Sequence, residues 1–279
     1  MPALLALFSS ALWGTGDYLG GSLTKRLAPL AVVGWSQVCG LVFMVLLSAT
    51  TGAWSDPTGY IPWALLAALC GLVGLVAFYR ALAGGAMGIV APLASLGSLV
   101  PIVVGLASGD HPSSWQLAGV GAALLGVVLA SGPEMSGQTK RRNVYLALFS
   151  AAVFGVVLLS IAKGSRISPL MTMTVMRLTQ VVLALGIGLA VRNFGGVRSK
   201  DFAWLVPIGL LDVLANVTYG LAAQRGLLSL VSVLGSLYPV MTLGLAARID
   251  HERLRRIQYI GVSATLLGVA LISLGGAPA

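Results

Sequence analysis

The sequence predicts an all-α integral membrane protein whose ten transmembrane helices form two inverted five-helix repeats. Three observations support this fold class: long apolar segments, an internal duplication, and an uneven distribution of Lys and Arg between successive loops. The mean hydropathy is +0.95, and only 9% of the 279 residues are charged while 57% are hydrophobic. A soluble domain does not need such a composition, so we expect the chain to lie in a membrane.

Short polar loops separate ten apolar segments of about 18 to 23 residues, each long enough to cross a bilayer as a helix. In hydrocarbon only helices and closed barrels satisfy the backbone, and continuous apolar runs indicate helices. The expected loops fall at residues 24–26, 54–57, 84–85, 109–112, 133–142, 163–168, 192–200, 224–226 and 248–256. The longest polar stretch, Gly132 to Asn143, divides the segments five and five.

The two halves of the chain match each other at offsets between 138 and 142 residues. The segment Leu5 to Gly14 matches Leu146 to Gly155, and Tyr79 matches Tyr219. Such matches indicate a tandem duplication. Because each half has an odd number of spans, the second must cross the membrane in the opposite sense. We predict a first repeat at residues 1–135 and a second, inverted repeat at residues 143–279.

The loops alternate in basic charge. The odd-numbered loops hold 13 Lys and Arg residues, the even-numbered loops hold 3, and the remaining one, Arg177, lies within an apolar segment. By the positive-inside rule the odd loops are cytoplasmic and both termini lie outside. The net charge of +9 is therefore a topology signal at the span ends, and we do not expect a nucleic-acid partner. We expect a multi-pass protein of the cell membrane, in a prokaryote the inner or plasma membrane.

The eighth apolar segment carries a stripe of polar residues. Asp212 lies near its middle, where a carboxylate costs at least a few kcal/mol and normally faces a cavity, a partner charge or a proton. Asn216 and Tyr219 follow at helical spacing on the same face. We interpret the stripe as part of a pathway through the protein, with Asp212 changing its protonation state. The alternative is a structural ion pair between helices.

The seventh and second segments carry polar residues at duplicated positions, Arg177 and Gln37. Equivalent inward positions suit a shared central cavity, and Arg offers a planar fork of donors to a carboxylate or phosphate. Two alternatives remain for Arg177: that it mainly neutralises Asp212, or that it snorkels outward to the interface.

Asp17 lies four residues after Trp13, on nearly the same face of the first segment. We predict that it is a second proton-sensitive carboxylate beside an aromatic wall. The alternative is an Asp near the cytoplasmic end of its span, paired with Lys25 or Arg26. An aromatic cage for an organic substrate or cation is predicted from Trp13, Tyr79, Tyr219 and Tyr238, although aromatic residues near span ends often serve as interfacial anchors instead.

Four short motifs carry a resemblance to a known family. They are Leu12-Trp13-Gly14-Thr15, Tyr79-Arg80-Ala81-Leu82, Ser236-Leu237-Tyr238-Pro239, and Asp250-His251-Glu252-Arg253-Leu254 followed by Gln258, Gly261 and Gly268. On these residues the whole chain resembles a ten-span EamA-type transporter of the drug/metabolite transporter superfamily. The first half departs from the pattern, since residues 109–112 lack a Glu at the place that corresponds to Glu252 in the second half.

The resemblance implies a secondary active transporter of small organic metabolites, with export the expected direction. Inverted repeats are typical of transporters that work by alternating access, with the site near the midplane where the halves meet. No cofactor and no metal site are expected, and no nucleotide-binding loop of the GxxxxGK[ST] type occurs in the sequence. The expected partners are a small-molecule substrate and the lipid bilayer, in a monomer or homodimer.

Two other functions are compatible with parts of the sequence. Gly14-Thr15-Gly16-Asp17 matches the GxGD sequence of intramembrane aspartyl proteases, and Asp212 would supply a second carboxylate. Their GxGD aspartate, however, follows the first catalytic Asp, which comes after a Tyr; here the order is reversed and Leu211 precedes Asp212, so we expect no enzyme. A non-transporting scaffold has no reason to tolerate the cost of so many inward polar residues.

Overall fold

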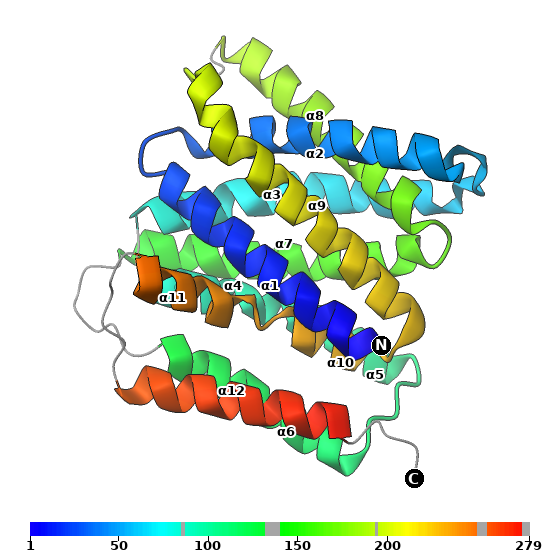
Figure 1. The fold of residues 1–279 in the computed structure, drawn as a ribbon, viewed down its shortest axis with the longest axis vertical. Helices are drawn as coiled ribbons and strands as arrows, with labels where there is room; N and C mark the ends of the chain where they lie inside the picture. Colours follow the sequence, from blue (N-terminus) through cyan, green and yellow to red (C-terminus); the bar gives the residue numbers. More distant parts are fainter. Residues whose placement is uncertain (85–86, 132–139, 193–194, 250–255, 275–279) are drawn as a thin grey trace.

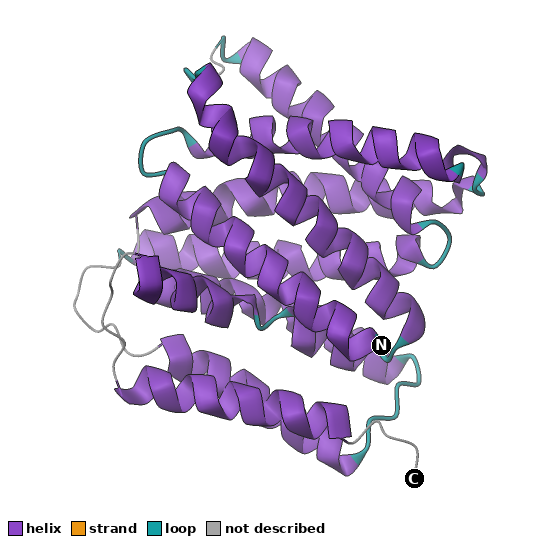
Figure 2. Ribbon diagram, in the orientation of Figure 1, coloured by secondary structure: helices purple, strands orange, loops and turns teal. Residues whose placement is uncertain are grey.

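The computed structural model describes residues 1–84, 87–131, 140–192, 195–249 and 256–274 (Figure 1). Over these ranges the chain is helical and contains no strand (Figure 2). Seven helical segments are long and apolar enough to cross a membrane, and the shorter helices at Ser114–Leu129 and Arg256–Ile272 are also apolar. The expectation of an all-helical membrane protein is confirmed at this level. The motif at residues 250–254 and most of the loop at residues 133–142 lie outside the described ranges.

The helices follow one another through short connections. In chain order they are α1 (Pro2–Leu23), α2 (Pro29–Thr51), α3 (Ile61–Gly84), α4 (Met87–Ser95), α5 (Leu99–Ala107), α6 (Ser114–Ser131), α7 (Arg141–Ser165), α8 (Pro169–Ala190), α9 (Phe202–Arg225), α10 (Leu228–Gly235), α11 (Tyr238–Ile249) and α12 (Arg256–Leu274). Short 3-10 helices add η1 (Ala53–Ser55), η2 (Thr58–Tyr60), η3 (Leu96–Ser98) and η4 (Ser199–Asp201).

Two of the apolar segments are broken helices. The 3-10 turn η3 separates α4 from α5, and α10 ends at Gly235 two residues before α11 begins. Each break lies one turn before a proline, Pro101 or Pro239. Proline has no N–H to donate, and its ring clashes with the carbonyl four residues earlier, which belongs to Gly97 or Gly235. Before each proline the α-helical hydrogen bonding is interrupted, by the 3-10 turn η3 in the first case and by the two residues between α10 and α11 in the second, while each segment continues as one span-length helical stretch.

Helices from the two halves of the chain interleave. The packed pairs are α1 with α9, α3 with α7, α2 with α8, α4 with α11, α5 with α10, and α6 with α12. Ser9 Oγ on α1 donates a 2.7 Å hydrogen bond to the Ala215 carbonyl on α9, and Ser150 Oγ on α7 donates a 3.1 Å bond to the Gly74 carbonyl on α3. The four residues of these two bonds are related by a single offset of 141 residues. The packing thus follows the duplication seen in the sequence.

The pair α6 and α12 lies at one edge of the molecule (Figure 1). Glycine allows its closest contacts: a Cβ on Gly119 would lie 2.7 Å from the Gly268 carbonyl oxygen, and one on Gly126 would lie 2.7 Å from the Gly261 carbonyl oxygen. Small residues of this kind let membrane helices approach each other closely. The order of the contacts shows that the two helices run antiparallel.

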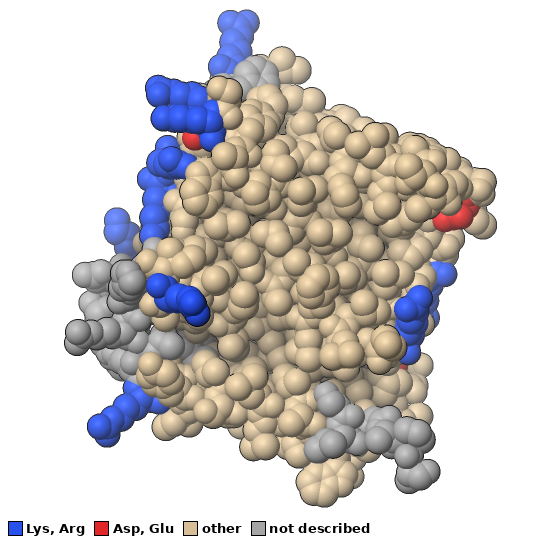
Figure 3. Space-filling view, in the orientation of Figure 1, with Lys and Arg blue, Asp and Glu red and all other residues tan. Residues whose placement is uncertain are grey.

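The surface is apolar between two charged edges. Lys and Arg gather mainly at the edge where α2 and α9 begin, fewer lie at the opposite edge, and the band between them is uncharged in Figure 3. Large apolar side chains are exposed on the surface, among them Leu46, Leu69, Leu125 and Leu266. Such a surface is suited to lipid and not to water.

Candidate functional site

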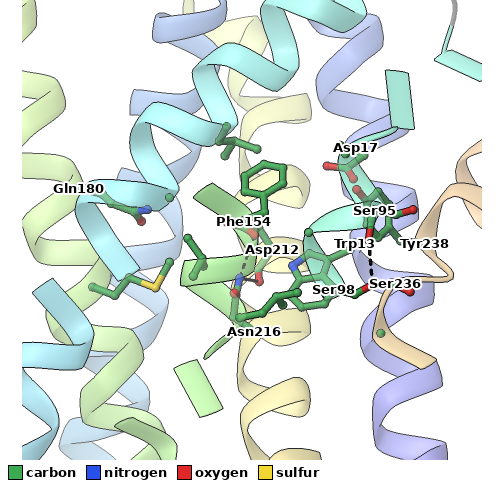
Figure 4. Close-up of a pocket in the computed structure, with 18 of the residues that line it drawn as sticks. Trp13, Asp17, Ser95, Ser98, Phe154, Gln180, Asp212, Asn216, Ser236 and Tyr238 are labelled. Atoms are coloured by element: carbon green, nitrogen blue, oxygen red, sulfur yellow. Dashed lines mark hydrogen bonds between the residues drawn. The ribbon is translucent and has the colours of Figure 1, made fainter. Parts of the chain in front are cut away.

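A cavity of about 90 Å³ lies inside the bundle (Figure 4). One buried water needs roughly 10–15 Å³ of cavity volume measured in this way, so the cavity has room for several waters or a small organic group. Its walls come from both halves of the chain. The lining is Trp13, Asp17, Gly71, Leu75, Ala94, Ser95, Gly97, Ser98, Phe154, Val157, Leu158, Met176, Arg177, Gln180, Asp212, Asn216, Gly235, Ser236 and Tyr238.

Both helix breaks open onto this cavity. Gly97 and Ser98 line it at the break before α5, and Gly235 and Ser236 line it at the break before α11. Non-helical backbone at membrane depth is tolerated only where protein covers it or where it borders a cavity. The two breaks therefore belong to the architecture of the site.

An ion pair forms the polar wall of the cavity. Arg177 Nη1 on α8 lies 2.9 Å from Asp212 Oδ2 on α9. The same nitrogen donates to Gln180 Oε1 at 2.9 Å and to Gln37 Oε1 on α2. Arg177 is 1% exposed, so its guanidinium points into the protein and does not snorkel to the interface. The duplicated positions Gln37 and Arg177 meet directly, as equivalent inward positions predict.

Asp212 is held by amide donors as well as by the guanidinium. Gln37 Nε2 donates to its Oδ2 at 3.2 Å, and Asn216 Nδ2 donates to its Oδ1 at 2.9 Å. With 22% of its side chain exposed, Asp212 is the more accessible member of the pair. In Figure 4, Asp212 and Asn216 lie between Gln180 on one side and Asp17 with Tyr238 on the other.

Among the described residues, the hydrogen-bond partners of the Arg177 guanidinium all lie on one of its three nitrogens. Three acceptors surround Nη1, whereas Nε and Nη2 are buried and make no hydrogen bond with any part of the chain that the structure describes. Arginine carries five N–H donors in a rigid fork, so the three on Nε and Nη2 remain available. Buried donors without a partner are costly, and such groups are enriched where a protein binds something.

Asp17 lines the same cavity from α1 and also a smaller one beside it, of about 10 Å³. Among the described residues it forms no hydrogen bond and no ion pair, so it is not paired with Lys25 or Arg26. Asp17 therefore faces the cavity and takes no part in an ion pair with a described residue at the end of its span. The two aspartates share a cavity, but Asp212 is paired with Arg177 and not with Asp17, unlike the carboxylate pair of an aspartyl protease.

The predicted aromatic residues divide into two groups. Trp13 and Tyr238 line the cavity, and Tyr79 lines the smaller one with Gln37. Tyr219 lies behind the wall: its ring packs on Trp13 with centroids 5.6 Å apart, and its hydroxyl is 2.9 Å from Ser232 Oγ. The four rings therefore do not form one cage, because a helical spacing places Tyr219 two turns from Asp212, against the neighbouring helix α10.

Several lining residues were not expected from the sequence. Phe154 and the hydroxyls of Ser95, Ser98 and Ser236 border the cavity. Each of these serines also bonds to a carbonyl three residues earlier in its own segment, as serines commonly do in membrane helices. The signal available in the sequence was the repeated Gly-Ser pair before each proline, which marks the two breaks.

Comparison with known proteins assigns the class. A polar site between two broken helices, inside an all-helical protein with span-length apolar helices, is a construction common among membrane transporters. The model of the EamA-like transporter family matches residues 1–132 and 141–274, and the chain belongs to that family. The family is one of membrane transporters.

A solved crystal structure shares the fold. It superimposes with a TM-score of 0.79 over 98% of this chain and 96% of the other, at 18% sequence identity. No curated protein matches the chain.

Proposed function

We propose that this protein is a secondary active transporter of small organic metabolites, working in the export direction by alternating access. The observation that carries the proposal is the cavity itself. It joins two broken helices at repeat-related positions, an ion pair, and a second carboxylate, all between the two halves of the chain. Discontinuous helices that surround a polar midplane site are the common construction of secondary transporters.

The helix packing supports ten spans in two inverted repeats, at residues 1–135 and 143–279. Here α4 with α5 counts as one span, and so does α10 with α11. Three spans of the first half then pack on their own equivalents in the second half: the second on the seventh, the fourth on the ninth, and the fifth on the tenth. The first span packs on the eighth as the third packs on the sixth. This is the pattern of a two-fold axis in the membrane plane. The family model also matches the two halves separately, and α1 begins on the side where α12 ends (Figure 1).

Substrate is proposed to bind in the cavity against Trp13, Arg177, Asn216 and Tyr238. Gln37 and Tyr79 border the adjoining space, and Tyr219 supports Trp13 from behind. In alternating access the two halves rock about this site and expose it to each side in turn. The glycines and prolines at the two breaks would absorb part of that motion.

Proton coupling is proposed to run through Asp212, with Asp17 as a second carrier. Asp212 is partly exposed and is paired with the Arg177 guanidinium. Protonation of Asp212 would break this ion pair, and Arg177 would still donate to the amide oxygens of Gln37 and Gln180.

The test is transport by purified protein in liposomes. Proteoliposomes would be given a metabolite extract and an imposed pH gradient, and the metabolites that accumulate would be identified by mass spectrometry. Gradient-dependent accumulation over empty liposomes is expected, and Asp212→Asn should abolish the dependence on the gradient. Exposed Arg166→Gln is the matched control and should transport as the wild type does. Accumulation that is the same with and without protein would refute the proposal.

A further inference from the structure

The unused edge of Arg177 provides a second place for an anion beside Asp212. Arg177 lines the cavity, and its Nε and Nη2 atoms are buried and have no acceptor among the described residues. This edge of a guanidinium presents two parallel N–H groups, which match the two oxygens of a carboxylate. Asp212 occupies Nη1 on the other side, so an incoming carboxylate need not displace it.

The charges around the cavity decide what can accompany that anion. The charged residues that line the cavity are Asp17 on α1, Arg177 on α8 and Asp212 on α9. The smaller adjoining cavity adds no other charged residue, and the titratable tyrosines facing these spaces are Tyr79 on α3 and Tyr238 on α11. With both aspartates ionised the site already carries one net negative charge.

A further anion would make two uncompensated negative charges in a region of low dielectric. Uncompensated charges are strongly disfavoured there. One proton on an aspartate returns the site to the single net negative charge that it carried before the anion entered. Asp212 can accept it and remain hydrogen-bonded through its amide partners, and Asp17 can accept it because no cation holds it ionised.

We propose that the Nε–Nη2 edge of Arg177 is an oxyanion subsite, and that it binds a small carboxylate together with one proton. The inference rests on the transport function proposed above and names its substrate class: small organic acids that enter the site as the carboxylate. Arg177 then bridges two carboxyl groups, the substrate on one edge and Asp212 on the other.

Propionate is a suitable probe, because its five heavy atoms suit a cavity of about 90 Å³, and propionamide is its uncharged match. The thermal unfolding temperature of purified wild-type protein would be measured with each, at pH 6 and pH 8 and at fixed ionic strength. Ligands that bind the folded state raise this temperature by mass action. We expect propionate to raise it and propionamide not to. Since one proton binds with the anion, the dissociation constant should rise by up to about tenfold per pH unit.

Arg177→Lys keeps the positive charge but loses the fork, and it should lose the propionate shift. Arg166→Lys makes the same exchange at an exposed position and should keep it. If Arg177→Lys does not fold, the wild-type comparison of propionate with propionamide at the two pH values decides alone. An equal shift with propionamide, a shift independent of pH, or no shift at all would overturn the subsite. Gradient-driven transport without a propionate shift would overturn the subsite alone, whereas a propionate shift without transport would overturn the transport function alone.

Discussion

The Arg177–Asp212 pair should respond unequally to the loss of each partner. Asp212→Asn leaves a guanidinium that is 1% exposed and cannot give up its proton. Arg177→Met leaves a carboxyl group that is 22% exposed, retains two amide donors, and can take up a proton. We expect Asp212→Asn to be the more destabilising change, although it preserves the shape of the side chain.

The size of the effect follows from burial. Breaking a buried ion pair by removing one partner costs about 3–5 kcal/mol. Partial exposure of Asp212 and the two amide acceptors left on Arg177 place Asp212→Asn near the lower end, about 3 kcal/mol. For Arg177→Met we expect about 1–2 kcal/mol, because the lost hydrogen bonds are partly replaced by protonation of Asp212. The double variant removes both charges and should cost about as much as Arg177→Met alone.

Thermal unfolding of the purified variants tests this order. With roughly 2–4 °C per kcal/mol for a chain of this size, Asp212→Asn should unfold about 6–12 °C below the wild type. The double variant should recover about half of that loss. Arg166→Met removes an exposed arginine and serves as the control, with little expected change. A double variant less stable than Asp212→Asn would refute the reasoning, because it would show that the buried guanidinium is not the costly group.

Three further predictions concern the topology, the helix packing and the role of the second helix break in transport. Lys140→Cys should react with a membrane-impermeant maleimide only after cells are opened, and Arg166→Cys should react in intact cells; the reverse would overturn the orientation. Gly126→Ala should destabilise the α6–α12 pair by about 1–3 kcal/mol in thermal unfolding, because its Cβ meets the facing backbone, whereas Gly121→Ala, with open space around it, should not. Pro239→Ala restores an N–H at the second break and should slow transport while leaving propionate binding intact; unchanged rates would show that the break is not part of the motion.

The sequence predicted the parts of the fold that depend on composition and repetition. Apolar length alone indicates helices in a membrane. Gln37 and Arg177 stand at matching positions in the two halves of the sequence, and their side chains meet in the structure. The Arg177–Asp212 contact was one of the open alternatives, and the structure contains it. In this case a pattern of charge in the membrane was enough, since a buried charge needs a partner.

Other features needed coordinates. Proline is visible in the sequence, but whether it bends a helix or breaks it depends on the packing around the preceding glycine. Tyr219 shares a face with Asp212 by spacing, yet two turns of helix carry it about 10 Å along the axis and out of the cavity. The Gly-Ser pairs before the two prolines mark Ser98 and Ser236 in the sequence. They do not show whether a hydroxyl faces the cavity, because a serine bonded to its own helix looks the same in sequence whether it faces a cavity or a neighbouring helix.

The glycine-lined pair at the edge of the molecule has a consequence for biogenesis. Helix α6 packs chiefly on α12, which is synthesised well after it. At about 5–20 residues per second, the roughly 120 residues between them take on the order of ten seconds to synthesise. During that interval α6 is in the membrane with its closest-packing face uncovered. A chain truncated before α12 would keep that face open permanently, which would make it a ready target for quality-control proteases that recognise unassembled membrane helices.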